Sequence, residues 1–177
     1  PGSPTPTVVT CDVYGTNVIF DQFEVIPATP GAPSQFSLNQ AFFDTVANTI
    51  YLQFNQSLSN GLDSYLYFRV SSSAALLTGV DMTVSGANAT VTELVCSDPI
   101  SRLTNVCNPG TTLANFAVSS GQSGDVSFGS AQSTIYIYKN VLTTQPPPTS
   151  ELSSFTQSFH VVPEPTTFAL LGGGLVA

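Results

Sequence analysis

Strict alternation of apolar and polar residues, repeated in run after run, constrains this chain more than any other feature. The apolar residues that share one phase within these runs are Ile50, Leu52, Phe54, Leu66, Phe68, Val70, Val80, Met82, Val84, Val91, Val95, Ile135, Ile137, Val141, Phe155, Phe159 and Val161. A period of two is the side-chain repeat of a β-strand, and turn-forming pairs such as Asn-Gly, Thr-Gly and Pro-Gly bound the runs. The pattern predicts antiparallel strands with one buried face.

Eight or more such strands without crossover helices indicate an all-β fold, an antiparallel two-sheet sandwich of jelly-roll-like type. Residues 38–46 fit either a short helical turn or a strand. We expect an extended segment over residues 1–7, the sandwich over residues 8–162, and a short apolar C-terminal tail over residues 163–177. The triple proline at 146–148 predicts a stiff connector before one last strand.

The chain carries very little charge, and almost none of it is positive. Charged residues make up 8% of the 177 residues, with three Lys and Arg against 11 Asp and Glu and a formal net charge of −8. A chain without a basic patch cannot neutralise phosphates, so we expect no nucleic-acid partner. A surface of Ser, Thr, Asn and Gln suits an exported protein, and we expect an extracellular or cell-surface location.

Cysteine spacing gives a second indication of the compartment. Cys96 and Cys107 bracket a segment rich in turn formers. This spacing suits a disulfide-closed loop, which an oxidising compartment would preserve; two unpaired thiols are the alternative. Zinc would need further ligands, and the single histidine, His160, lies far away in sequence. Cys11 is left over, either as a buried thiol or as an intermolecular thiol that links two chains.

The last residues carry the most specific motif. Val162, Pro163, Glu164 and Pro165 are followed by an apolar stretch rich in Leu and Gly. About ten helical residues span roughly 15 Å, half of a bilayer core of roughly 30 Å, so the stretch as given cannot cross a membrane.

This motif resembles the C-terminal sorting signal of the PEP-CTERM proteins, which are exported bacterial substrates of the exosortase. The strand over residues 154–159 that runs into the motif, and the cysteine-closed loop, are similar to those of the small β-sandwich members of the group. The chain departs from the family pattern because no basic cluster closes it and the apolar run is short. The resemblance implies export, an exosortase as a partner, and transient membrane contact through the C-terminal segment, but no reaction.

Residues that could support catalysis are scarce. His160 lies on the polar phase of the last strand, and the sequence contains no Gly-x-Ser-x-Gly elbow. We expect the acidic residues to lie singly on turns and solvent faces, which argues against paired carboxylates. We therefore predict a protein that is not an enzyme and has no cofactor or metal. Calcium is the one ion kept open, at Asp12 with Asp21 or at Asp63 alone.

Two pairs of tyrosines suggest a binding role. Tyr65 with Tyr67, and Tyr136 with Tyr138, each share one face of a strand. Exposed, they would form a strip that stacks on sugar rings; covered, they would fill a second core with their hydroxyls at its rim. The first expectation for function is a structural surface or matrix protein that assembles into a homo-oligomer or polymer, helped by strand addition of the tail. The alternative is an extracellular polysaccharide-binding module.

Overall fold

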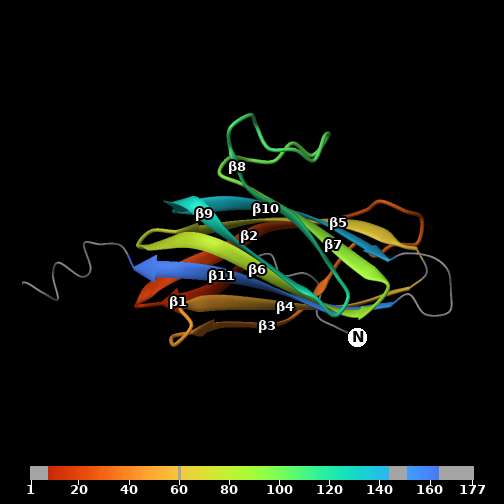
Figure 1. Ribbon diagram of the computed structural model, residues 1–177, viewed down its shortest axis with the longest axis horizontal. Coiled ribbons are helices and arrows are strands. Elements are labelled where there is room, and N and C mark those ends of the chain that lie inside the picture. Colours follow the sequence, from red (N-terminus) through yellow and green to blue (C-terminus); the bar gives the residue numbers. More distant parts are fainter. Residues whose placement is uncertain (1–7, 60, 144–150, 164–177) are drawn as a thin grey trace, which may run out of the picture.

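Eleven strands in two antiparallel sheets make up the computed structural model of the protein (Figure 1), which describes residues 8–59, 61–143 and 151–163. The six-stranded sheet contains, in spatial order, β1 (Val8–Val13), β2 (Thr16–Pro27), β5 (Asp63–Ser72), β10 (Thr134–Thr143), β7 (Ala89–Cys96) and β8 (Thr112–Ser119). The five-stranded sheet contains β3 (Ser37–Asp44), β4 (Thr49–Ser59), β11 (Glu151–Pro163), β6 (Ala75–Ala87) and β9 (Ser123–Gln132).

The predicted all-β, two-sheet sandwich is confirmed. Most connections cross from one sheet to the other, and only β1–β2, β3–β4 and β7–β8 are hairpins within a sheet. This winding places β10 between β5 and β7, and β11 between β4 and β6. Of the two possibilities for residues 38–46, the strand is the correct one, because β3 pairs with β4 over Ser37–Asp44. No helix in the described part of the chain has the length and apolarity to cross a membrane.

The core lies between the sheets and contains the in-phase apolar residues of the alternating runs. Phe20 and Phe68 of one sheet pack against Phe159 of the other, with ring centroids 5.3 and 6.2 Å apart. Phe54 stacks on Phe155 at 4.9 Å. Burial of these rings is the main favourable contribution to folding, because each removes a large apolar area from water.

A second, smaller apolar cluster lies on the outer face of the six-stranded sheet. Its buried members are Tyr67, Leu94, Cys96, Ile100 and Tyr138. Four of them alternate with inward-facing residues on β5, β7 and β10, and Ile100 belongs to the connection between β7 and β8. This connection, coloured green at the top of Figure 1, stands over the sheet. The sheet is therefore covered on both faces at this point.

Candidate functional site

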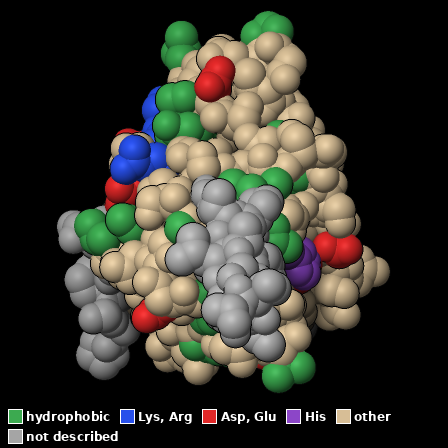
Figure 2. Space-filling view, turned by 90° about the vertical axis from the view of Figure 1, so that its left-hand side faces the viewer, with side chains coloured by type: hydrophobic (Ala, Val, Ile, Leu, Met, Phe, Trp, Pro, Cys, Tyr) green, Lys and Arg blue, Asp and Glu red, His purple; other side chains and the backbone are tan. Residues whose placement is uncertain are grey.

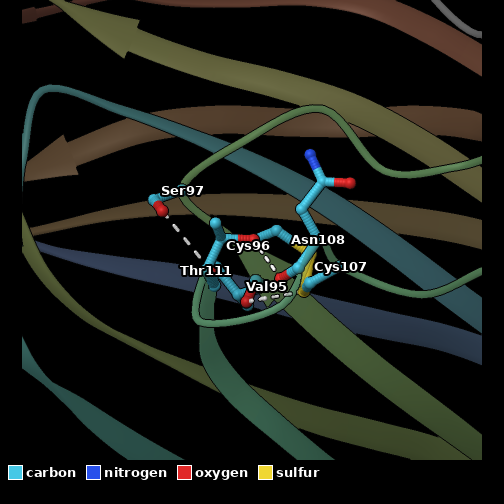
Figure 3. The surroundings of a disulfide bond; sticks show 6 residues. All are labelled: Val95, Cys96, Ser97, Cys107, Asn108 and Thr111. Carbon is cyan, nitrogen blue, oxygen red and sulfur yellow. Dashed lines mark hydrogen bonds between the residues drawn. A yellow bond between two sulfur atoms is a disulfide. The ribbon is translucent and has the colours of Figure 1, made fainter.

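The disulfide-closed connection over residues 97–111 is the most elaborate non-strand feature of the described chain. Cys96, the last residue of β7, is bonded to Cys107 with a Cα–Cα distance of 5.6 Å (Figure 3). The base of the loop is closed by a hydrogen bond of 2.9 Å from the amide of Ser97 to the carbonyl oxygen of Thr111. The expected disulfide between Cys96 and Cys107 is therefore present. It ties the loop to the end of β7.

Two side chains of the loop anchor it to the tyrosines beneath. The side-chain amide of Asn105 accepts a short hydrogen bond from the hydroxyl of Tyr67 and donates one of 3.5 Å to the hydroxyl of Tyr138. The guanidinium of Arg102 lies over the Tyr67 ring, with Cζ 3.8 Å from the centroid, and its Nε lies 2.8 Å from Oε2 of Glu24 on β2. The loop is thus bound to three strands by polar contacts as well as by the disulfide.

Burial under the loop changes the chemistry of the two covered tyrosines. Burial raises the pKa of both the Tyr67 and the Tyr138 hydroxyls above the ordinary value of 10.0. Neighbouring tyrosines add to the increase at Tyr138, whereas the charge of Arg102 partly opposes it at Tyr67. Both groups are therefore neutral hydrogen-bonding groups at physiological pH.

Of the two arrangements left open for the four tyrosines, the structure shows the covered one for Tyr67 and Tyr138. Tyr67 is 1% exposed and Tyr138 is 8% exposed, while Tyr65 and Tyr136 are half-buried. The Tyr138 ring packs against those of Tyr65 and Tyr67 at centroid distances of 5.6 and 5.1 Å. The covered alternative describes the face better, because the rings of Tyr67 and Tyr138 form a second core under the loop. Sequence reasoning missed Arg102 and Asn105, since their contacts depend on how the loop folds back.

A pocket of about 350 Å³ opens beside the anchored loop. Its lining residues are Thr92, Leu94, Asn105, Val106, Cys107, Thr112, Asn115 and Tyr138. The lining contains amides, hydroxyls, a phenol and apolar surface, and no ionisable carboxylate or amine. Such a lining can hydrogen-bond a neutral polar ligand and offer it one aromatic edge.

Cys11 is free and lies in the main core, 6% exposed. Burial raises the pKa of its thiol, which further lowers its reactivity. Of the two roles expected for this residue, the structure favours the buried thiol. A bond to a second chain would require β1 to leave the sheet.

Two half-buried residues and one exposed residue form a group on the outer face of the five-stranded sheet. Nε2 of His160 lies 3.2 Å from Oδ2 of Asp81 and 3.4 Å from Oδ1 of Asp125. Asp81 and Asp125 are direct partners in the β6–β9 pair, and His160 comes from β11 on the other side of β6. Figure 2 shows the chain's histidine in purple beside acidic side chains in red, on a face that is otherwise mostly neutral. The expectation that acidic residues lie singly is wrong here.

The hydrogen bonds around His160 define what this group can do. The hydroxyl of Thr49 donates to the carbonyl oxygen of Ala47 at 3.0 Å, so it accepts from Nδ1 of His160, 3.3 Å away. With the Nδ1 proton fixed in this way, Nε2 faces the two carboxylates. Nε2 can carry a second proton and form an ion pair with the carboxylates, or its lone pair can bind a divalent cation that the carboxylates also hold. The ligand atoms of His160, Asp81 and Asp125 lie within 4.8 Å of one another.

The acidic residues named for calcium are not brought together. Asp12 lies beside the β1–β2 turn, where its Oδ1 accepts a hydrogen bond of 2.8 Å from the amide of Gly15. Asp21 lies at the other end of the same hairpin and pairs with Arg69. Asp63 lies apart from both, and burial raises the pKa of its carboxyl. The pairing of Asp12 with Asp21 as calcium ligands is therefore wrong, because the hairpin register separates them.

One acidic and one basic residue are in the core, where no acidic residue was expected. Lys139 of β10 and Glu93 of β7 are direct strand partners, and both are fully buried. Nζ of Lys139 lies 2.5 Å from Oε2 of Glu93 and also contacts the side-chain oxygen of Gln157 on β11. The prediction that all acidic residues lie on turns or solvent faces is wrong for Glu93, because its in-phase neighbours face the core.

The sorting motif lies almost wholly beyond the described part of the chain. β11 includes Val162, which is 42% exposed, and ends at Pro163. Glu164, Pro165 and the apolar tail lie outside the described residues, as does the extended segment over residues 1–7.

No family model and no curated protein matches this chain. Among solved structures, it is similar to the carbohydrate-binding module TmCBM61 in complex with β-1,4-galactotriose, at 12% identity and a TM-score of 0.39 over 81% of this chain and 89% of that one. It is also similar to the K3 cleaved adhesin domain of Lys-gingipain from Porphyromonas gingivalis w83, at 12% identity and a TM-score of 0.38 over 80% of this chain and 91% of that one.

Proposed function

We propose that this protein is an exported, non-enzymatic component of the bacterial cell surface or extracellular matrix, sorted by an exosortase and assembling with copies of itself. The observation that carries the assembly proposal is the composition of the strands at the edges of the two sheets. The four edge strands, β1, β8, β3 and β9, contain no Lys, Arg or Pro. Lys and Pro are two of the means by which soluble proteins prevent edge-to-edge pairing.

All three basic residues of the chain are engaged away from these edges. Arg69 pairs with Asp21, Arg102 with Glu24, and Lys139 with Glu93. What remains on the described surface is neutral or acidic. Neutral hydroxyl and amide groups cost less to desolvate than ionised groups, and hydrogen bonds formed across an interface offset that cost, which supports assembly.

The β8 edge is the best suited of the four to pair with another strand. From Ala114 to Ser119 it follows β7 in uninterrupted register, whereas β3 and β9 each contain a bulge or shift against their neighbours. The register of β1 against β2 is equally regular, but β1 carries the charge of Asp12, whereas β8 contains no charged residue. A regular edge presents an ordered row of backbone donors and acceptors to an incoming strand. The apolar tail and a second β8 edge are both candidates for that strand.

Assembly is tested by light scattering and electron microscopy of the purified protein over a range of concentrations. We expect ordered oligomers or filaments from the wild type. Ala117→Lys places a charge on the exposed face of β8 and should shift the protein to monomers. Thr83→Lys adds the same charge on the exposed face of the interior strand β6 and should leave assembly unchanged. A wild-type protein that stays monomeric at all concentrations would contradict the assembly proposal.

A polysaccharide-binding role is the second candidate, favoured by the pocket beside the disulfide loop. Asn105, Asn115 and Tyr138 supply neutral donors and acceptors there together with one aromatic ring. Neutral sugars are recognised by this combination of hydrogen bonds and apolar contact.

A glycan array with the wild type and Asn115→Ala separates the two candidates. We expect retention of a neutral polysaccharide by the wild type and its loss in the variant, with Thr83→Ala as a control outside the pocket. A flat profile for the wild type would remove the second candidate and leave the first unaffected.

A further inference from the structure

The buried polar group around Lys139 joins the two sheets at the centre of the sandwich. Lys139 and Glu93 come from β10 and β7 of the six-stranded sheet, and Gln157 comes from β11, the middle strand of the other sheet. All three side chains are fully buried. Met82, the strand partner of Gln157, completes the group with Sδ 3.3 Å from Nζ of Lys139.

We propose that Lys139 and Gln157 form an intramolecular amide bond between the sheets, with Glu93 as the group that moves the proton. Nζ of Lys139 already contacts Oε1 of the Gln157 amide. The carbon to be attacked is one bond from that oxygen. Nε2 of Gln157 donates a hydrogen bond of 3.1 Å to the carbonyl oxygen of Ser158, which holds the amide with its oxygen toward the lysine.

The surroundings of Lys139 and Glu93 favour the uncharged amine and the uncharged carboxylic acid, which are the forms that this reaction needs. Burial lowers the pKa of Lys139 and raises the pKa of Glu93, and the attraction between the two groups opposes both changes. Oε1 of Glu93 has no hydrogen-bond partner among the residues that the structure describes, so a full carboxylate charge is poorly compensated at this position. Apolar neighbours add to the effect, because the ring of Phe155 lies 5.6 Å from Nζ.

The bond changes balance without any other reactant. Glu93 accepts a proton from the lysine ammonium, which leaves a neutral amine. The Nζ lone pair attacks Cδ of Gln157, and the carbonyl electrons move to Oε1. As they return, the protonated Glu93 gives its proton to Nε2, the bond from Cδ to Nε2 breaks, and Glu93 takes up the proton that Nζ loses. The products are a secondary amide and one molecule of ammonia.

The interior location explains why the product would persist. Water is excluded from the group, so the amide is protected from hydrolysis once ammonia has left. The bond would connect the fourth strand of one sheet to the third of the other. A covalent link at this point would prevent the sheets from separating under load, whether or not the protein assembles or binds sugar.

Mass spectrometry of the denatured, reduced full-length protein tests the bond directly. We expect an intact mass below that of the sequence by one ammonia. Cleavage after glutamate releases residues 94–151 and 152–164 as separate peptides if no bond exists. With the bond, they remain joined through Lys139 and Gln157, and trypsin no longer cleaves after Lys139.

Two variants remove the chemistry while conserving side-chain size. Lys139→Met lacks the nucleophile and Glu93→Gln lacks the proton acceptor, so both should show the full sequence mass. If neither folds, the wild-type digest alone decides. Free peptides with the full mass, an ammonia loss located elsewhere, such as at Asn60-Gly61, or a water loss that joins Lys139 to Glu93 would each overturn the proposal.

Discussion

The guanidinium carbon of Arg102 lies 3.8 Å from the centre of the Tyr67 ring, so a cation from the disulfide loop covers a tyrosine of β5. The same side chain pairs with Glu24 on β2. Arg102 therefore secures the middle of a loop whose ends are already fixed by the bond between Cys96 and Cys107.

Removing this contact should loosen the loop without unfolding the sandwich. The Arg102 side chain is 42% exposed, and a cation–π contact at an exposed site contributes about 0.5–1 kcal/mol. The substitution also removes the exposed ion pair with Glu24, which adds roughly 0–1 kcal/mol. We expect Arg102→Ala to lower the free energy of unfolding by about 1 kcal/mol and to speed hydrogen exchange at the Asn105 amide, which donates a hydrogen bond to the carbonyl oxygen of Ser101. Leu103→Ala is the matched control, because that side chain is 93% exposed. Equal exchange rates in both variants would show that Arg102 does not hold the loop.

Loss of the disulfide should cost considerably more. The bond closes a loop with a sequence separation of 11, for which loop-closure entropy gives a stabilisation of roughly 3 kcal/mol. We expect the double variant Cys96→Ala/Cys107→Ala to lose about this much in urea denaturation, and reduction of the wild type to have the same effect. The Cys11→Ser variant should remain sensitive to reduction; insensitivity would indicate that Cys11 takes part in the bond.

Glycine at position 79 is required by close packing. A Cβ there would lie 2.9 Å from the carbonyl oxygen of Val126 and 3.2 Å from Cδ2 of His160. We expect Gly79→Ala to destabilise the protein by about 1–3 kcal/mol, as overpacking does elsewhere, and to displace the imidazole from Asp81. Gly129→Ala is the control, because its Cβ would meet nothing within 4 Å. Similar denaturation midpoints for the two variants would contradict this account.

Because Tyr138 is covered by the loop, we expect the protein to lose stability at alkaline pH. Burial raises the pKa of Tyr138 in the folded protein above the value of 10.0 that it has when unfolded. Its contribution is fully present below pH 10 and falls as pH rises further, because the unfolded chain releases the phenol proton first.

Comparison with Tyr138→Phe isolates this contribution, since Lys139 and the other titrating groups are common to both proteins. We expect the difference in the free energy of unfolding between wild type and variant to be constant up to about pH 9 and then to shift in favour of the variant. The measurement is urea denaturation at a series of pH values. Tyr51→Phe, at a half-buried ring outside the loop, serves as a second comparison for the loss of a phenol hydroxyl. A difference that stays constant through pH 11 would show that Tyr138 titrates as it does in the unfolded chain.

The sequence could have predicted that the Lys139 side chain points inward, but not which residue it meets there. Lys139 is in phase with Ile137 and Val141, and Glu93 is in phase with Val91 and Val95, so alternation alone directs both side chains inward. The expectation that acidic residues occupy solvent faces outweighed this signal. The alternating pattern does not reveal that β7 pairs with β10. This pairing brings the two opposite charges together, so that each compensates the burial of the other.

The sequence by itself determined the class of fold and which side chains face inward, because the side-chain repeat of a strand is local and independent of its neighbours. It also determined that Cys96 and Cys107 can close a loop. Only the tertiary structure decided which distant residues meet. The order β4–β11–β6–β9 brings His160 to Asp81 and Asp125. The loop folds back over Tyr67 and Tyr138, which therefore form a second core. Such contacts depend on strand register and loop path, which are set by the packing of the whole chain and not by any single segment of it.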